Sequence, residues 1–245
     1  MATIHLILQG KGGVGKSFVS SLLAQYLIDR DVKVACFDTD PVNATFSAFK
    51  SLKVHKVDIL EDDSINSRLF DSLIEKLLQL PDGSSAVIDN GAASFIPLAS
   101  YISENMVPDL IRESGHDLII HTVITGGQSA GDTLKGLQSL LGGFDSPLIV
   151  WVNPFFGSTD YFTDHDLRQK VIQGDGKCIV LPSYKKDTFG YDIETMLSRK
   201  LTFDEAVQTS EINLMARQRL KIVQRKIYQL LDEAQIVKET DDATE

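Results

Sequence analysis

Residues 9–17 read Gln-Gly-Lys-Gly-Gly-Val-Gly-Lys-Ser, and this stretch decides the fold. From Gly10 it matches the pattern G-x-x-x-x-G-K-[S/T], which has meaning only between a strand and a helix. Residues 3–9 form a short apolar run typical of a buried parallel strand, and residues 16–30 carry apolar side chains at helical spacing. The sequence therefore predicts a strand, a phosphate-binding loop and a helix in succession.

The loop suits a phosphate group because glycines let successive backbone N–H groups turn inward with no side chain in the way. The N-terminus of the following helix adds partial positive charge. Lys16 would bring a cation to the β- and γ-phosphates, and the Ser17 hydroxyl would ligate Mg²⁺. A glycine-rich turn without a ligand is the alternative. The predicted nucleotide-binding residues are Gly10, Lys11, Gly12, Gly13, Val14, Gly15, Lys16, Ser17 and Phe18.

The rest of the chain alternates between the two kinds of element. Apolar runs predict strands at residues 32–38, 85–89, 118–124, 148–152 and 177–181, and helical spacing predicts helices at residues 67–80, 133–141 and 211–237. This alternation predicts an α/β fold with a mostly parallel sheet and helices on both faces. With 245 residues, we expect a single domain over residues 1–237 and an acidic, flexible tail at 238–245.

The composition limits the functional classes. Asp and Glu outnumber Lys and Arg by 34 to 24, which argues against a uniformly basic nucleic-acid-binding surface but not against a local patch. Cys36 and Cys178 lie in apolar runs and are interpreted as buried strand residues in a reducing compartment. No apolar run reaches the roughly 20 residues that span a bilayer. The first predicted strand starts almost at Met1, so we expect no signal peptide and a cytoplasmic protein.

Three aspartates lie at the ends of predicted strands. Asp38 and Asp40 are close in sequence at the end of residues 32–38, and Asp89 ends residues 85–89. Ligands of open α/β sheets bind at the carboxyl ends of strands, so we expect these carboxylates to face the phosphate loop. There they could hold Mg²⁺ or accept a proton from an attacking water. A turn role stays open for Asp40, which precedes Pro41, and for Asp89.

The segment Lys11–Ser17 resembles the deviant Walker A motif of the ParA/MinD family of P-loop ATPases, because it has a second lysine at its start. The resemblance implies that Lys11 reaches across a homodimer interface to the nucleotide of the partner subunit. Dimerisation would then depend on ATP. An exposed loop lysine without this role is the alternative.

Two further segments resemble the switch regions of that family. Residues 38–45 resemble switch I, and residues 86–91 resemble a Walker B strand that leads into switch II. The resemblance implies that Asp40 orients or activates the attacking water and that Asp38 and Asp89 serve the Mg²⁺ ion. Asn90 departs from the Pro or Thr that the family more often has after this aspartate.

Asn153 follows residues 148–152, and Pro182 follows residues 177–181. By the same resemblance Asn153 reads the edge of adenine, with one donor and one acceptor, and Pro182 lies in the loop that closes over the base. The guanine signature Asn-Lys-x-Asp is absent from the sequence, so ATP is favoured over GTP. Asn153 could instead begin a turn before Pro154.

The last predicted helix carries a run of cations with no acid between them, namely Arg217, Arg219, Lys221, Arg225 and Lys226. Family members that bind DNA non-specifically use basic residues near their C-terminus, and such binding would depend on salt. A solvated helix face is the alternative. The acidic residues 239–245 would be repelled by anionic lipid, so we expect no membrane insertion.

Within the family, residues 9–17 and the chain length resemble the TraL/StbB-type group of conjugative plasmids. This implies a role in plasmid conjugation, stability or DNA positioning. The leading hypothesis is a dimeric switch that binds and hydrolyses ATP with Mg²⁺, slowly unless a protein partner stimulates it. The alternatives are an ATP-dependent small-molecule ligase of the same fold, such as dethiobiotin synthetase, and a nucleotide-binding adaptor without turnover.

Overall fold

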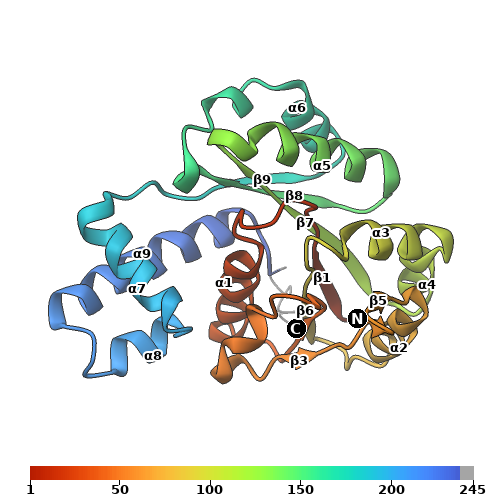
Figure 1. The fold of residues 1–245 in the computed structure, drawn as a ribbon, viewed down its shortest axis with the longest axis horizontal. Coiled ribbons are helices and arrows are strands. Elements are labelled where there is room, and N and C mark those ends of the chain that lie inside the picture. Colours follow the sequence, from red (N-terminus) through yellow and green to blue (C-terminus); the bar gives the residue numbers. More distant parts are fainter. Residues whose placement is uncertain (238–245) are drawn as a thin grey trace, which may run out of the picture.

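The computed structural model describes residues 1–237, which are built around a parallel sheet (Figure 1). In this part of the chain the sheet has seven strands in the order β3-β2-β6-β1-β7-β8-β9, and all neighbouring strands run parallel. A separate antiparallel pair, β4 (Leu60–Glu61) and β5 (Ser64–Ile65), lies outside it. The strands of the main sheet are β1 (Thr3–Ile7), β2 (Val34–Asp38), β3 (His55–Lys56), β6 (Ser85–Asp89), β7 (Asp117–Thr125), β8 (Leu148–Asn153) and β9 (Lys177–Val180). The predicted mostly parallel sheet is confirmed.

Helices cover both faces of the sheet, as predicted, because successive strand residues point to opposite faces and both sets are apolar. One face packs against α1 (Lys16–Asp29), α7 (Tyr191–Ser198), α8 (Phe203–Gln208) and α9 (Leu214–Glu233). The other face packs against α2 (Asp71–Leu78), α3 (Phe95–Glu104), α4 (Val107–Glu113), α5 (Ala130–Gly143) and α6 (Asp166–Gln173). In Figure 1, α5 and α6 lie above the sheet, and α7, α8 and α9 lie together at the lower left.

Most differences from the predicted boundaries have local causes. The strand predicted over residues 3–9 ends at Ile7, before the loop begins to turn. The helix predicted over residues 67–80 opens with a 3-10 turn, Ser67–Phe70, before α2. The helix predicted over residues 211–237 begins only at Leu214, because the Asn213 side chain accepts the backbone N–H of Ala216 at 2.9 Å and caps it. The predicted tail lies outside the described residues.

The register of the central strands fixes where the candidate site lies. Asp38 at the end of β2 is level with Asp89 at the end of β6, and Asp89 is level with Ile7 at the end of β1. Because all three strands are parallel, their carboxyl ends meet at one edge of the sheet. The phosphate loop that follows β1 therefore lies beside both aspartates. Within residues 1–237, no helix combines the length and apolar character that crossing a membrane requires.

Candidate functional site

The loop after β1 forms a cradle of backbone N–H groups at the start of α1. Gly13 and Gly15 have φ angles of 74° and 107°, in the left-handed region that favours glycine. The first turn of α1 has neither a side-chain cap nor an acidic residue. The first N–H groups of the helix are therefore available to an anion, which the helix dipole also attracts.

The two lysines of the loop point to different places. Lys16 is buried, and its Nζ donates to the backbone oxygen of Lys11 at 3.1 Å. Burial lowers the pKa of Lys16, while the charges of Asp89 and Asp40 act to raise it. The Nζ of Lys11 instead lies 3.0 Å from Oδ2 of Asp132, in the first turn of α5, and both side chains are exposed. The Lys16 ammonium group therefore bonds within the phosphate loop, whereas the Lys11 ammonium group extends out of the loop to α5.

Oxygen atoms of the kind that ligate a hard cation lie close to Lys16. Oδ1 of Asp89 accepts the Ser20 hydroxyl at 2.9 Å, and the Ser17 hydroxyl also interacts with this carboxylate and acts to lower its pKa. Burial raises the pKa of Asp89 to about 7, against the opposing effect of the two hydroxyls and of Lys16. Asp38 is also fully buried, and burial raises its pKa, although it accepts the N–H groups of Asp40 at 3.0 Å and Ser47 at 2.9 Å.

This donor set fits Mg²⁺ better than an all-protein metal site. Among residues 1–237, no three His, Cys, Asp or Glu side chains cluster as metal ligands. Mg²⁺ is usually held by one or two protein oxygens together with phosphate oxygens and waters. A hydroxyl and a carboxylate beside an anion-binding loop meet that requirement.

Asp40 combines a turn with an available oxygen. Its Oδ1 accepts the N–H groups of Val42 and Asn43, each at 2.9 Å, so the turn role left open by the sequence is present. Its Oδ2 accepts no hydrogen bond from the described residues. A Cβ on Gly91 would lie 2.6 Å from Cγ of Asp40, so Gly91 lets the segment after β6 pack directly against this carboxylate.

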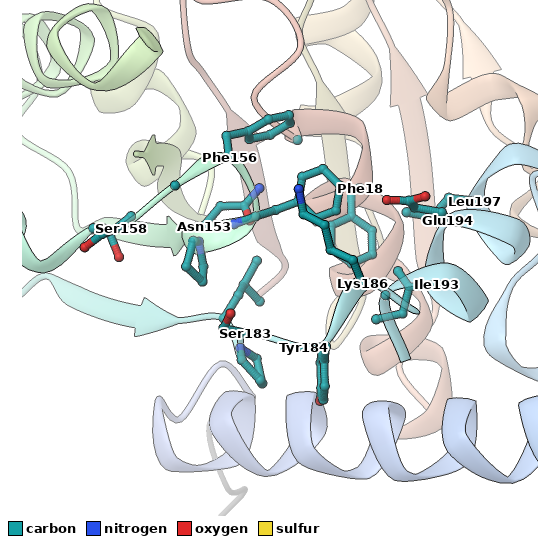
Figure 2. Close-up of a pocket in the computed structure, with 18 of the residues that line it drawn as sticks. Phe18, Asn153, Phe156, Ser158, Ser183, Tyr184, Lys186, Ile193, Glu194 and Leu197 are labelled. Atoms are coloured by element: carbon teal, nitrogen blue, oxygen red, sulfur yellow. The ribbon is translucent and has the colours of Figure 1, made fainter. Parts of the chain in front are cut away.

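A cavity of about 900 Å³ opens beside the loop (Figure 2). Gly13, Gly15, Phe18, Asn153 and Pro182 line it, which brings together five of the predicted nucleotide-binding residues from three separate segments. Figure 2 shows Asn153, Phe18 and Lys186 among the residues that line the cavity, with Phe156 at the top of the view and Tyr184 at the bottom. The cavity is lined mainly by apolar and aromatic groups with a few polar ones, which is typical of ligand sites.

The Asn153 amide is already engaged. Its Nδ2 donates to the backbone oxygen of Val14 at 3.0 Å, and its Oδ1 accepts the N–H of Phe155 at 3.1 Å. Asn153 therefore begins a turn, which was the alternative interpretation of the sequence. Its bond to Val14 also fixes the phosphate loop to the end of β8. One N–H and one lone pair of this amide have no partner among the described residues, and Asn153 lines the cavity.

The structure also shows residues that the sequence did not single out. Asp132 pairs with Lys11, although they are far apart in the chain. Gln9 is fully buried and donates to the backbone oxygen of Val123 at 3.0 Å, while its Oε1 accepts the N–H of Lys11 at 3.3 Å. A polar residue at the end of an apolar run was the one signal for Gln9. No local pattern marks Asp132.

Two of the five predicted cations of α9 are bound to other parts of the protein, so the five do not form one exposed basic patch. Arg219 donates to the buried carboxylate of Asp192, with a second contact at 3.3 Å, and Arg217 donates to the backbone oxygen of Val207 at 3.4 Å. Lys221, Arg225 and Lys226 are exposed, and within residues 1–237 they form no ion pair. Any phosphate-binding patch on this helix would depend on these last three cations.

Comparisons with known proteins agree with this geometry. The model of the CobQ/CobB/MinD/ParA nucleotide binding domain matches residues 5–209. Two Escherichia coli proteins named Protein TraL are 44% and 41% identical over 243 and 249 residues, covering 97% of this chain and 100% of each relative. Among solved structures, the MinD cell division protein of Aquifex aeolicus matches with a TM-score of 0.54 and 16% identity, covering 92% of this chain and 96% of that one.

Proposed function

Because the chain belongs to the CobQ/CobB/MinD/ParA nucleotide-binding domain family, we propose that it binds and hydrolyses ATP and acts as a dimeric switch. One observation carries this proposal. The N–H cradle, Lys16, Ser17 and Asp89 meet at one edge of the sheet, next to a cavity of about 900 Å³. The cradle suits a polyphosphate, and the adjoining apolar cavity suits a nucleoside.

Within the site, each residue has a distinct proposed role. The N-terminus of α1 and Lys16 hold the β- and γ-phosphates. Ser17, Asp89 and Asp38 hold Mg²⁺, which when bound neutralises charge on the phosphates. Phe18, Asn153 and Pro182 contact the base. The structural support is that Phe18, Asn153 and Pro182 share one cavity and that the Ser17 hydroxyl interacts with Asp89.

Asp40 is the proposed acceptor for the attacking water. Two backbone N–H groups hold its Oδ1, which fixes the carboxylate plane and leaves Oδ2 without a donor from residues 1–237. A carboxylate positioned in this way can accept a hydrogen bond from water and orient it toward the γ-phosphate. The electrostatic contact of Asp40 with Lys16 is consistent with a place beside the phosphates.

Lys11 is proposed to act on the nucleotide of a partner subunit. Its ammonium points away from its own loop to Asp132, and this ion pair is exposed, so water screens it and it contributes little to stability. A triphosphate in a second copy would be a stronger partner for the ammonium. Charge delivered there would increase in effect as the phosphoryl oxygens become more negative during transfer.

The likeness to the TraL proteins supports a proposed role in plasmid conjugation, stability or DNA positioning. A protein partner would stimulate slow turnover. DNA could be held by Lys221, Arg225 and Lys226, the exposed cations of α9. The ligase alternative requires a second substrate, and the adaptor alternative requires nucleotide binding without turnover.

The decisive experiment compares Lys11→Ala, Lys16→Ala and the control Lys135→Ala, an exposed lysine of α5. We measure Mg·ATP affinity by calorimetry, oligomeric state by light scattering and phosphate release. Lys16→Ala should lose nucleotide binding. Lys11→Ala should keep binding, lose ATP-dependent dimers and release phosphate at least about tenfold more slowly. Lys135→Ala should match the unmodified protein.

Three outcomes would contradict the proposal. Failure of the unmodified protein to bind ATP with Mg²⁺ would remove its basis. Binding without phosphate release, even with cell extract of a plasmid-bearing host, would favour the adaptor. Turnover by a monomer that Lys11→Ala leaves unchanged would favour the ligase.

A further inference from the structure

Asn90, the residue after Asp89, is fully buried at the end of β6, and both its side-chain oxygen and its side-chain nitrogen are hydrogen-bonded. Its Oδ1 accepts the Thr39 hydroxyl at 2.9 Å and the Ser94 hydroxyl at 2.7 Å. Its Nδ2 donates to the backbone oxygen of Gly91 at 3.1 Å. Thr39 lies next to Asp40, and Ser94 precedes α3, so one amide joins two segments that are about fifty residues apart.

The orientation of this amide follows from its partners. The Gly91 oxygen can only accept, so the NH₂ group must face it and the carbonyl oxygen must face the two hydroxyls. A hydroxyl can donate to this oxygen, and the oxygen has two lone pairs, so both bonds form at once. An aspartate here would place an acceptor against the Gly91 oxygen, and an alanine would leave both hydroxyls without this partner.

Ser94 provides independent evidence that the link is specific. It occupies the N-cap position of α3, where a serine side chain ordinarily accepts an N–H of the first turn. Here it makes no cap and donates most closely to Asn90, while the backbone oxygens of Gly91 and Thr39 lie farther from it, at 3.2 and 3.3 Å. The start of α3 therefore lacks the stabilising N-cap hydrogen bond, and the Ser94 hydroxyl instead joins α3 to the end of β6.

The two joined segments are also in direct contact. The N–H of Thr39 donates to the Asp89 oxygen at 2.9 Å, and Gly91 packs so closely on Asp40 that a Cβ would not fit. Displacing Asp40 therefore requires either movement of Gly91 or loss of the Thr39–Asn90 bond. Interfaces packed this closely shift as units rather than deform continuously.

We propose that Asn90 is a positioning residue that joins the segment of residues 39–47, which carries Asp40, to the segment of residues 91–95 at the start of α3. The two segments then respond as one unit to the nucleotide. Asn90 touches neither the nucleotide nor the attacking water and acts only through Thr39 and Ser94. This inference rests on the proposed ATPase function for its effect on turnover, but the link itself is a property of the nucleotide-free chain.

Amide hydrogen exchange tests the link without nucleotide. Ser94→Ala should speed exchange in residues 39–47 about fivefold, and Thr39→Val should do the same in residues 91–97, since each removes one hydrogen bond of the shared oxygen. Ser47→Ala is the matched control. Its hydroxyl donates to the Ala44 oxygen within its own segment and also interacts with Asp38, but it has no bond to Asn90 or Ser94 among the described residues, so residues 91–97 should not change.

Turnover gives the second readout. Ser94→Ala should leave ATP affinity unchanged and lower kcat by about tenfold, which corresponds to misplacement of Asp40 rather than loss of binding. The combined Thr39→Val and Ser94→Ala variant should lose little more than either single variant, because both hydroxyls make their shortest bonds to one oxygen and their contacts with backbone oxygens are longer, at 3.2 or 3.3 Å. Asn90→Ala should reproduce the double variant.

The inference is overturned if Ser94→Ala changes exchange only around α3, as Ser47→Ala does in its own segment, or if the two single effects on kcat multiply. Should the unmodified protein show no ATP turnover, the proposed function fails, while the exchange result in nucleotide-free protein still decides the link. Thermal unfolding of every variant verifies that the fold is kept.

Discussion

At the scale of single residues, the site is assembled from groups whose burial costs stability. Asp89 is a carboxylate at the buried end of a strand, and burial raises its pKa to about 7. Lys16 is buried nearby, and its pKa is lowered for the same reason. Such shifts are concentrated at functional sites, where charged groups are kept in positions that folding alone would not favour.

Replacing Asp89 by Asn should therefore stabilise the nucleotide-free protein. With a folded pKa of about 7 and an unfolded value of 3.8, the folded chain holds the proton more tightly, so the contribution of this group falls as the pH rises between those values. The gain should be small at pH 4 and about 2–4 kcal/mol above pH 7. Urea unfolding across this range measures it.

The exposed hairpin aspartate Asp62, changed to Asn, is the control and should shift stability little at any pH. If Asp89→Asn lowers the free energy of unfolding, or if its stabilising effect does not increase with pH, then ionisation of the buried carboxylate does not destabilise the fold and the prediction is wrong. The same variant should bind Mg·ATP more weakly, because the negative oxygen near the cation is lost.

At the scale of secondary-structure elements, α5 packs closely against Gln9, the residue before the phosphate loop, because Gly136 of α5 has no side chain. A Cβ on Gly136 would lie 2.3 Å from Oε1 of Gln9. Gln9 also donates to Val123 in β7 and to the Thr133 oxygen at 3.3 Å in α5. Glycine in mid-helix is unfavourable, so this position serves the close approach of the Gln9 amide.

Alanine at two glycines of α5 should act in opposite directions. Gly131→Ala, at an exposed position with nothing within 4 Å of the new methyl group, should stabilise the chain by about 0.5–1 kcal/mol. Gly136→Ala should destabilise it by about 1–3 kcal/mol, because the methyl group meets the Gln9 side chain. Chemical denaturation of both variants checks this. A stabilising Gly136→Ala would show that Gln9 moves aside freely.

At the scale of the whole molecule, three central strands are joined by a buried chain of ring nitrogens. Nε1 of Trp151 in β8 donates to Nδ1 of His121 in β7 at 3.0 Å. The remaining nitrogen of His121 lies 3.0 Å from Nδ1 of His5 in β1, which places the proton on His121 Nε2. Nε2 of His5 is buried without a partner among the described residues. The bonds from Trp151 to His121 and from His121 to His5 form only while both rings are neutral, because a protonated ring has no acceptor nitrogen.

Acid should therefore weaken the whole fold through these rings. Burial lowers the pKa of His5 to about 4 and that of His121 well below its usual value. Because the unfolded chain binds protons more readily, this contribution is present above about pH 6.5 and is lost as the pH falls toward 4. For His5 alone the loss is about 3 kcal/mol. Fluorescence of Trp151, the single tryptophan, reports unfolding.

A His5→Phe, His121→Leu double variant isolates this effect from that of Asp89. It should be less stable at pH 7, since the Trp151 N–H loses its acceptor, yet lose less stability on acidification than the unmodified protein. The exposed His55, changed to Asn, should leave the acid dependence unchanged. Parallel slopes for the unmodified protein and the double variant would contradict the prediction.

Local sequence patterns were enough to predict the strands, the main helices and the phosphate loop. Apolar spacing and glycine placement act over a few residues, so β6 was predicted to its ends and Gly13 and Gly15 lie in the left-handed region. The parallel arrangement followed from the alternation of strands and helices. It correctly brought Asp38 and Asp89 to the same edge.

Which side chains are in contact follows from the packing of the folded chain and could not be predicted from local patterns. Lys11 with Asp132, Asn153 with Val14, and Thr39 with Asn90 join segments that are far apart in the chain. No local pattern encodes such pairs, because they depend on strand order and register rather than on spacing. The basic run of α9 shows the same limit, since Arg219 looks free in sequence and is bound to the buried Asp192 in the fold. A hydrogen bond depends on distances of a few tenths of an ångström, and only the packed chain sets those.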